Sequence, residues 1–515
     1  MGTIACFQCG NKDIKFNENY AKLDVDLNPL SSSDQYRNIN TKADTFHTSS
    51  LKNKKTLKIG KGDFVRIRQD NFFDEYELKE KLGEGAYGSV YKVYQKKTNY
   101  IRAVKAIKKK NVYRNEFMNE IDVLKTVDHP NIIKIFDCYY DDIFYYMVEE
   151  YCNGGDLFDY IKKEKSFTER KASIIFKQLL SAINYLHKKN IVHRDLKPDN
   201  IVFIKTSNNN IFIKIIDFGT STAFRGKNLS QEFGTIYYIA PEVIMNNYNE
   251  KADIWSCGII LYTMLCGHPP FCGSEENIIK AKILHSKLNF PEKDFKNISI
   301  EAIEFIKQLL AYDPKKRLSA EEALKNTWLN NNSSYGNIKL NEEIIFNLSK
   351  FKTTLGLQKL TISFLTNQIS INEEIKTLKE EFDKFDVNKD GEISKEELIE
   401  CLKVCYPHKE AVERAEWVLN EIDFNDDGKI NFSEFLTANF KKEKLLSKEA
   451  LEKAFKLFDK DGNGFITLDE LKECIPIEIT SKLEWKELIS EVDKDGDNQI
   501  SLNEFKEMME NLINN

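Results

Sequence analysis

Residues 193–200 read His-Arg-Asp-Leu-Lys-Pro-Asp-Asn, and this stretch decides the fold. Residues 83–90 (Gly-Glu-Gly-Ala-Tyr-Gly-Ser-Val) precede it, and residues 217–219 (Asp-Phe-Gly) and 240–242 (Ala-Pro-Glu) follow it. One such motif alone is weak evidence, because an isolated Lys or Asp is usually a solvated surface charge. Four motifs in this order are specific, and the fold assignment rests on the order.

The glycine-rich stretch is typical of a loop that lies against phosphate, because glycine has no Cβ to hold its amide away from phosphate oxygens. Dinucleotide-binding turns share the G-x-G-x-x-G pattern, so the residues downstream decide between the two. Lys105 lies in a strand-like segment, 101–107, and Glu120 in a helical segment, 116–126, so these side chains can pair beside a nucleotide. The predicted nucleotide-binding residues are Leu82, Gly83, Glu84, Gly85, Ala86, Tyr87, Gly88, Ser89, Val90, Lys105 and Glu120.

The polar residues downstream predict phosphoryl transfer from ATP. We expect Asp195 to accept the proton of the attacking hydroxyl, Asn200 to hold a Mg²⁺ ion, and Asp217 to bridge metal and phosphates. This chemistry requires positioning and charge neutralisation rather than a covalent intermediate, and the set supplies both.

Residues 76–328 resemble a protein kinase catalytic domain of the serine/threonine class. The resemblance implies a two-lobed α+β fold, with strands first and helices later. It also implies that Lys197 contacts the transferred phosphate and that Arg317 pairs with Glu242 in a structural role. The predicted catalytic residues are Asp195, Lys197, Asn200 and Asp217.

Two acidic residues predict which substrate sequences are preferred. Asp156 follows Gly154-Gly155, where an acid in related kinases holds an arginine upstream of the phosphoacceptor, and Asp199 adds a second acid. We therefore expect protein substrates with basic residues before the target Ser or Thr. The alternative is that Asp156 only caps the helix that follows it.

Two places depart from the family pattern. Glu149 falls where relatives keep a hydrophobic or small residue at the back of the adenine pocket, and a buried carboxylate is costly unless it is paired. The sequence therefore does not decide the affinity for ATP or the selectivity for inhibitors. In the activation segment, Gln231 and Glu232 replace a clear phosphothreonine, with Ser230 nearby, and Glu232 is a candidate partner for Arg194.

Four stretches match D-x-[DN]-x-[DN]-G-x₅-E, the calcium loop of an EF-hand. Ca²⁺ takes about six to eight oxygens, which such a loop supplies from positions 1, 3, 5, 7 and 12. An acidic turn without calcium is the alternative for one loop, but four in register exclude it for the set. The predicted ligands are Asp386, Asn388, Asp390, Glu392 and Glu397; Asp423, Asn425, Asp427, Lys429 and Glu434; Asp459, Asp461, Asn463, Phe465 and Glu470; and Asp493, Asp495, Asp497, Gln499 and Glu504.

Two further loop positions carry predictions. Position 6 of the fourth loop is Asn498 instead of glycine, and we expect weaker but surviving binding, because Asn tolerates a left-handed backbone. Position 8 is isoleucine in every loop, which predicts a short β contact between neighbouring hands.

Composition and periodicity suggest the domain boundaries. We expect a flexible leader at 1–70, a kinase domain at 76–329 and an autoinhibitory junction segment at 330–372. An all-α region of two paired lobes follows, with EF-hands at 373–407, 410–445, 446–480 and 481–515. One helical stripe is predicted in the junction segment: Ile344, Leu348, Phe351, Leu355, Ile362, Leu365 and Ile369.

This apolar stripe predicts a switch. Such a helix can lie in the groove of an opened EF-hand lobe, or on the kinase, where it would block activity at low calcium. The alternative is an ordinary packed helix without a switching role. The kinase before it and the EF-hands after it favour the switch.

The order of kinase, connector and four EF-hands resembles the calcium-dependent protein kinase family, over residues 70–515. The resemblance implies ATP, Mg²⁺ and Ca²⁺ as cofactors and activation without separate calmodulin. Calcium must then bind the active arrangement more tightly than the inactive one. Two alternatives are an inactive calcium-responsive scaffold, which only Glu149 favours and the intact catalytic residues oppose, and an enzyme that is active without calcium.

Charge and composition exclude other classes. Residues 371–515 hold 21 Lys and Arg against 37 Asp and Glu, a balance of −16 within a net charge of −6. The mildly basic remainder has no basic stripe with interleaved aromatics, so we expect no nucleic acid partner. The sequence has no apolar run of about 18 residues and no signal peptide, and its scattered cysteines fit a reducing cytoplasm.

The first six residues, Met-Gly-Thr-Ile-Ala-Cys, resemble an N-myristoylation signal at Gly2, although Ser or Thr is usual at position 6. Cys6 and Cys9 are candidate palmitoylation sites, and two lipids hold a membrane where one is marginal. We therefore expect a cytoplasmic protein with possible attachment to a membrane. Zinc binding at Cys6 and Cys9 is disfavoured, because no second pair with zinc spacing follows.

Overall fold

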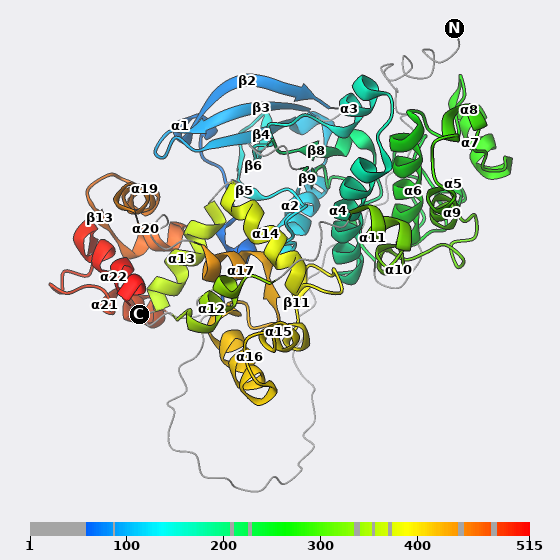
Figure 1. The fold of residues 1–515 in the computed structure, drawn as a ribbon. Helices are drawn as coiled ribbons and strands as arrows, with labels where there is room; N and C mark the ends of the chain where they lie inside the picture. Colours follow the sequence, from blue (N-terminus) through cyan, green and yellow to red (C-terminus); the bar gives the residue numbers. More distant parts are fainter. Residues whose placement is uncertain are drawn as a thin grey trace, which may run out of the picture. The chain divides into compact units, whose positions relative to one another are not determined.

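The computed structural model describes residues 58–85, 88–205, 211–224, 229–333, 340–352, 356–368, 373–440, 447–474 and 482–514 (Figure 1). They form a strand lobe (58–150), a helical lobe (151–333), a connector (340–368) and four helix–loop–helix repeats (373–514). Within this described part of the chain, no helix has the length and apolar character needed to cross a membrane.

The strand lobe is a six-stranded sheet with the order β1-β5-β6-β4-β3-β2. Alternation along β4 places Val104 and Ala106 in an apolar cluster and turns Ala103 and Lys105 to the opposite face. The helix α2 carries Glu120. The elements are η1 Lys61–Phe64, β1 Arg66–Arg68, α1 Phe72–Glu75, β2 Tyr76–Glu84, β3 Gly88–Gln95, β4 Ile101–Lys108, η2 Lys109–Asn111, α2 Arg114–Thr126, β5 Ile135–Tyr140 and β6 Phe144–Glu150.

The predicted flexible leader is wrong for residues 58–70. The strand β1 lies at the edge of the sheet and pairs in parallel with β5, whereas the other strand pairs of the sheet are antiparallel. Phe64 and Val65 are buried, and the ring of Phe64 lies 5.6 Å from that of Phe364 in the connector. Polar residues flank this short apolar segment, so the sequence pattern did not predict it. The segment is ordered by contacts with distant parts of the chain.

The helical lobe is built around α6, which is buried along nearly its whole length. The 20-residue α4 begins at Thr168, whose hydroxyl accepts a hydrogen bond from the Lys171 amide. Short strands flank the loop at 193–200. The elements are α3 Leu157–Glu164, α4 Glu169–Lys188, β7 Ile191–Val192, η3 Pro198–Asn200, β8 Ile201–Phe203, β9 Ile213–Ile215, β10 Thr222–Ala223, α5 Pro241–Ile244, α6 Lys251–Cys266, α7 Glu276–His285, α8 Glu292–Phe295, α9 Ile300–Leu309, α10 Ala320–Leu324 and α11 Thr327–Ser333.

The connector is two helices, α12 Glu342–Lys350 and α13 Gly356–Gln368, so the expected single stripe is wrong. Phe351 ends α12 with an extended backbone (φ −62°, ψ 127°). The stripe residues of the two helices are nevertheless buried, whereas Leu355 and Ile369 lie outside the described residues. Apolar spacing in the sequence predicted the buried face but not the break.

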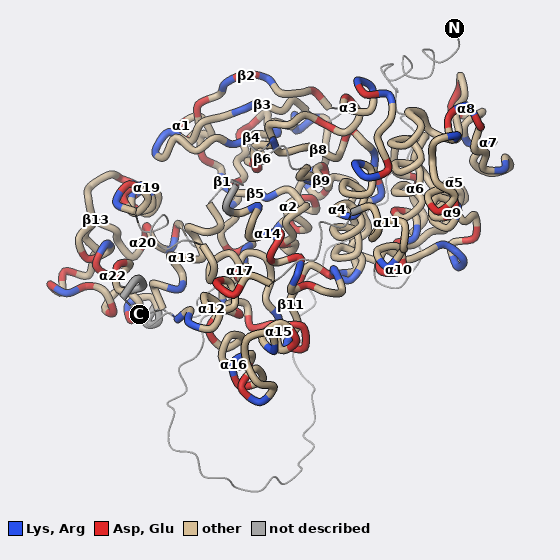
Figure 2. Tube along the Cα trace, viewed as in Figure 1, with Lys and Arg blue, Asp and Glu red and all other residues tan. Residues whose placement is uncertain are grey.

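The repeats pair in two lobes, as predicted. Ile393 lies opposite Ile430 between the first two loops, and Ile466 lies opposite Ile500 between the last two. Acidic residues mark α15 in Figure 2. The elements are α14 Glu373–Phe385, β11 Glu392–Ile393, α15 Lys395–Leu402, α16 His408–Ile422, β12 Ile430–Asn431, α17 Phe432–Asn439, α19 Lys448–Phe458, β13 Phe465–Ile466, α20 Leu468–Cys474, α21 Lys482–Ser490, β14 Ile500–Ser501 and α22 Leu502–Asn514.

Candidate active site and calcium loops

Lys105 joins the two lobes at the candidate active site. Its Nζ lies 2.7 Å from Glu120 Oε1 on α2 and 2.9 Å from Asp217 Oδ1 in the loop after β9. Burial opposes the charge of Lys105, but the two carboxylates raise its pKa above the usual range. Lys105 in turn lowers the pKa of Asp217 to about 2. The structure thus brings these three predicted residues together as a charged set.

The loop at 193–200 arranges the other predicted catalytic residues. Asp195 Oδ2 lies 2.7 Å from Lys197 Nζ, and Asn200 Nδ2 donates to the Asp195 carbonyl at 2.8 Å. Asp195 Oδ1 accepts from both the amide and the hydroxyl of Thr235, at 2.9 and 3.0 Å. This leaves a carboxylate held from two sides by donors that fix its orientation.

Sequence reasoning missed two residues that hold this loop. Thr235 is one, and its position shortly before the Ala-Pro-Glu motif was the only available signal. Asp253 on α6 is the other: its carboxylate accepts from the amides of His193 and Arg194, both at 2.9 Å, and contacts His187 Nε2 at 2.9 Å. Asp253 is buried, so it anchors the loop to the core of the helical lobe.

The glycine-rich segment is a hairpin between β2 and β3. Leu82, Gly83 and Glu84 lie on β2 and Gly88, Ser89 and Val90 on β3, with Gly85 between them. A Cβ at Gly88 would lie 2.0 Å from the Ala106 carbonyl oxygen, so only glycine fits this approach to β4. Ala86 and Tyr87 lie outside the described residues.

The activation segment is held differently from the expectation. Glu232 pairs with Lys280 on α7 at 2.7 Å, and Arg194 lies over the ring of Phe233, 4.1 Å from its centroid. The suggestion that Glu232 serves Arg194 is therefore wrong. Arg194 is held instead by a cation–π contact with Phe233 and by a hydrogen bond from its Nε to the Thr220 carbonyl, and sequence spacing revealed neither.

The pairing of Arg317 with Glu242 is confirmed. Arg317 Nη2 lies 3.0 Å from Glu242 Oε2, and Nη1 bonds the other carboxylate oxygen, so the contact is bidentate. Both side chains are buried. Asp156 Oδ1 accepts from the Asp159 amide at 2.8 Å, so Asp156 does cap α3.

The loops contain the predicted calcium ligands, and their carboxylates converge most clearly in loops three and four. One carboxylate oxygen each from Asp459, Asp461 and Glu470 lies within 4.8 Å of the others, as do those of Asp493, Asp495 and Glu504. Such clusters of oxygens fit a hard cation. The backbone of Asn498 is left-handed (φ 63°), and its amide donates to Asp493 Oδ2 at 2.9 Å.

The predicted position-3 and position-5 residues of these two loops contact one another directly. Asn463 Nδ2 donates to Asp461 Oδ2 at 2.9 Å, and the Asp497 amide donates to Asp495 Oδ1 at 3.2 Å. Gln499 and Phe465 stand at position 7, where the backbone carbonyl is the expected ligand. The second loop has the same local pattern, with the Asp427 amide donating to the Asn425 side chain at 2.9 Å.

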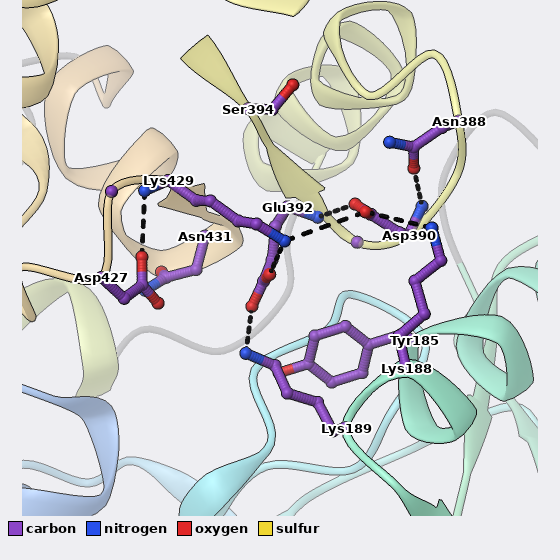
Figure 3. A network of polar contacts seen from close by, with 12 residues as sticks. Tyr185, Lys188, Lys189, Asn388, Asp390, Glu392, Ser394, Asp427, Lys429 and Asn431 are labelled. Carbon is purple, nitrogen blue, oxygen red and sulfur yellow. Dashed lines mark hydrogen bonds and ion pairs between the residues drawn. The ribbon is translucent and has the colours of Figure 1, made fainter. Parts of the chain in front are cut away.

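The first loop contacts α4 of the helical lobe (Figure 3). Lys188 Nζ lies 3.3 Å from Asp390 Oδ2, and Lys189 pairs with the side chain of Glu392. Asn184 Nδ2 donates to the Lys389 carbonyl at 3.0 Å. Three loop positions therefore meet the last turns of one helix.

Two further contacts shape this loop. A Cβ at Gly391 (φ 82°) would lie 2.7 Å from the rings of His129 and Tyr185, so glycine is required both by the backbone and by the approach to α4. Lys429 of the second loop lies 2.8 Å from Glu392 Oε2. Glu392 therefore lies between cations of the helical lobe and of the neighbouring hand.

The geometry defines a protein kinase joined to paired EF-hands, and sequence comparison agrees. The protein kinase domain family matches residues 76–329, and the EF-hand domain pair family matches residues 375–438 and 448–510. The chain is 39% identical to calcium-dependent protein kinase 4 of Plasmodium falciparum (isolate 3D7), over 84% of this chain and 86% of that protein. It is 37% identical to calcium-dependent protein kinase 5 of the same organism (84% and 76%) and 38% identical to calcium-dependent protein kinase 3 of Plasmodium yoelii yoelii (82% and 79%).

This chain belongs to the calcium-dependent protein kinase family.

Proposed function

We propose that this chain is a calcium-activated serine/threonine protein kinase that transfers the γ-phosphate of ATP to protein hydroxyls. The observation that carries the proposal is the joint placement of Lys105, Glu120 and Asp217 beside a loop that holds Asp195. The inactive scaffold has no comparable support, because the charged set is complete. The paired Lys105 also suits a nucleotide phosphate.

Each residue has a distinct part in the proposed reaction. Lys105, oriented by Glu120, holds the phosphates, and Asp195 accepts the proton of the substrate hydroxyl. Lys197 lies beside Asp195 and meets the transferred phosphoryl group, whose negative charge it offsets. Bound ATP would supply the phosphoryl group, and Mg²⁺ held by Asn200 and Asp217 would offset the phosphate charge.

Calcium control is proposed to pass through the first loop to α4. Calcium would fix the carbonyl of Glu392, and the side chain of that residue meets Lys189. The ordering of the first loop by calcium and the contact of this loop with α4 therefore depend on each other. The connector, packed against α17 and α21 of the repeats, would be released from the kinase in the same step.

The substrate and membrane proposals rest on sequence. We propose that Asp199, with Asp156, favours basic residues before the phosphoacceptor, although Asp156 also caps α3. Acylation at Gly2, Cys6 and Cys9, which lie outside the described residues, would attach the chain to a membrane. The substitution Gly2→Ala should then abolish incorporation of labelled myristate.

The test is phosphate transfer from ATP and Mg²⁺ to a basic serine peptide, with saturating calcium and with chelator. We expect transfer only with calcium, and a rate lower by about two to four orders of magnitude for Asp195→Asn. Equal transfer in both conditions would show that activity does not depend on calcium. No transfer in either condition, with calcium still bound, would support the scaffold.

A further inference from the structure

Glu149 is a buried acid without a partner at the predicted nucleotide site. Only 9% of the residue is exposed, and no hydrogen bond or ion pair joins its carboxyl to another described residue. Its neighbour Glu150, by contrast, pairs with Lys214 at 2.8 Å. Because buried carboxyls are costly when unpaired, this one calls for a donor that the described protein residues do not supply.

Strand register shows where this carboxyl points. Lys105 lies opposite Met147, and Ala103 lies opposite Glu149, between β4 and β6. Residues opposite one another share a face, as do residues two apart along a strand, so Glu149 shares the face of Lys105. Lys105 reaches Asp217 from that face, which is therefore the face against which nucleotide phosphates are proposed to lie.

The electrostatics agree with this placement. Burial raises the pKa of Glu149 to about 8, while Lys105 opposes the shift and Glu120 and Asp217 reinforce it. Lys105 is already paired with those two carboxylates, so Glu149 is a third acid for which it has no close contact. The carboxyl therefore remains available to a ligand.

The spacing points to the base of the nucleotide. Ala103 and Glu149 lie two residues along the strand direction from Lys105 and Met147, a displacement of roughly 7 Å. Gly88 pairs with Ile107 near the other end of β4, so a nucleotide whose phosphates lie at the glycine-rich turn carries its base toward Ala103 and Glu149. Among the purine nucleotides, adenine presents an exocyclic amino group, a donor, at its 6 position, where guanine presents an acceptor.

We propose that the Glu149 carboxyl accepts a hydrogen bond from the 6-amino group of bound adenine and so acts as a specificity-determining residue of the ATP site. This inference rests on the proposed function. The bound base would satisfy the unpaired acid, which offsets the cost of burying it. Glu149 would thus favour nucleotides that carry an amino group at this edge.

Titration calorimetry with Mg²⁺ and calcium tests the proposal on the full chain. ATP is compared with purine riboside triphosphate, which lacks the 6-amino group, for the wild type, Glu149→Leu and Glu149→Gln. Deleting the amino group should weaken binding about tenfold more in the wild type than in Glu149→Leu. Glu149→Gln should keep part of the difference, because its amide oxygen also accepts.

Met147→Leu is the matched control, because it alters the same face of the same strand without altering a polar group. It should show the wild-type penalty. An equal penalty in the wild type and Glu149→Leu would overturn the inference and leave the kinase proposal intact. If the folded wild type, with a normal thermal transition, bound neither nucleotide, both proposals would fall.

Discussion

Lys188 of α4 and Asp390 of the first EF-hand loop form an ion pair, with Nζ 3.3 Å from Oδ2. Asp390 is also a predicted calcium ligand. One carboxylate therefore serves the contact with the kinase and the proposed binding of calcium. Two cations near one carboxylate repel each other, so the lysine and the calcium ion affect each other's binding.

Replacing Lys188 with Met should raise the calcium affinity of the first loop by about two- to fivefold, because the competing charge is removed from a partly exposed pair. Calcium titration of the full chain measures the effect. Lys171→Met is the control, since Lys171 lies on the same helix but pairs with Glu164 rather than with a calcium loop. A gain that persisted in an Glu397→Gln background would place the effect in another loop and contradict the prediction.

Replacing Asp195 with Asn should lower the rate of phosphate transfer by about two to four orders of magnitude, because the amide cannot accept the hydroxyl proton. Binding of ATP and the thermal transition should change little, since the amide oxygen can still accept from Thr235. Single-turnover kinetics and calorimetry measure the two quantities. A parallel loss of ATP binding would show that Asp195 acts in binding rather than in proton transfer.

Replacing Arg317 with Met should lower the free energy of unfolding by about 3 to 5 kcal/mol, because Glu242 would remain buried and unpaired. Chemical denaturation measures the change. The double variant with Glu242→Met should be markedly more stable than the single variant. Equal stabilities for the two would mean that the orphaned charge is not the cause.

Replacing Glu149 with Gln should stabilise the fold increasingly as pH rises. The pKa of Glu149 is raised to about 8 in the folded chain, so the wild type loses stability between the unfolded value of 4.5 and about pH 8. The neutral amide escapes this loss, which amounts to about 5 kcal/mol at high pH. Thermal unfolding from pH 5 to pH 9 measures it, and a difference that did not vary with pH would refute the assignment.

Replacing Asn498 with Gly should raise the calcium affinity of the fourth loop by about two- to fivefold, because glycine adopts the left-handed backbone without strain. The fluorescence of Trp485, which is buried in α21, reports on this pair of hands. The other loops already have glycine at this position, so their affinities should stay unchanged. A uniform shift in all four would point to a global effect.

The sequence predicted the parts of this molecule in which function fixes residue types at fixed spacing. Lys105, Glu120 and Asp217 lie together as their motifs predicted, and the isoleucines of the EF-hand loops pair because each loop has the same length. The order of the motifs was therefore sufficient to predict these contacts.

Features that depend on tertiary contact were not predictable. The break at Phe351, the strand β1 and the stacking of Arg194 on Phe233 are each decided by partners far away in sequence. Thr235 and Asp253 hold the catalytic loop through backbone amides, which leave no pattern in the residue types around them.

The strand β1 has a practical consequence for the size of the catalytic unit. A fragment that began at Tyr76, where the kinase family match starts, would leave β5 as an open sheet edge. It would also uncover the apolar surface that Phe64 and Val65 now shield. Open edges and bare apolar patches associate with other chains, so we expect such a fragment to aggregate more readily than one that begins near residue 58.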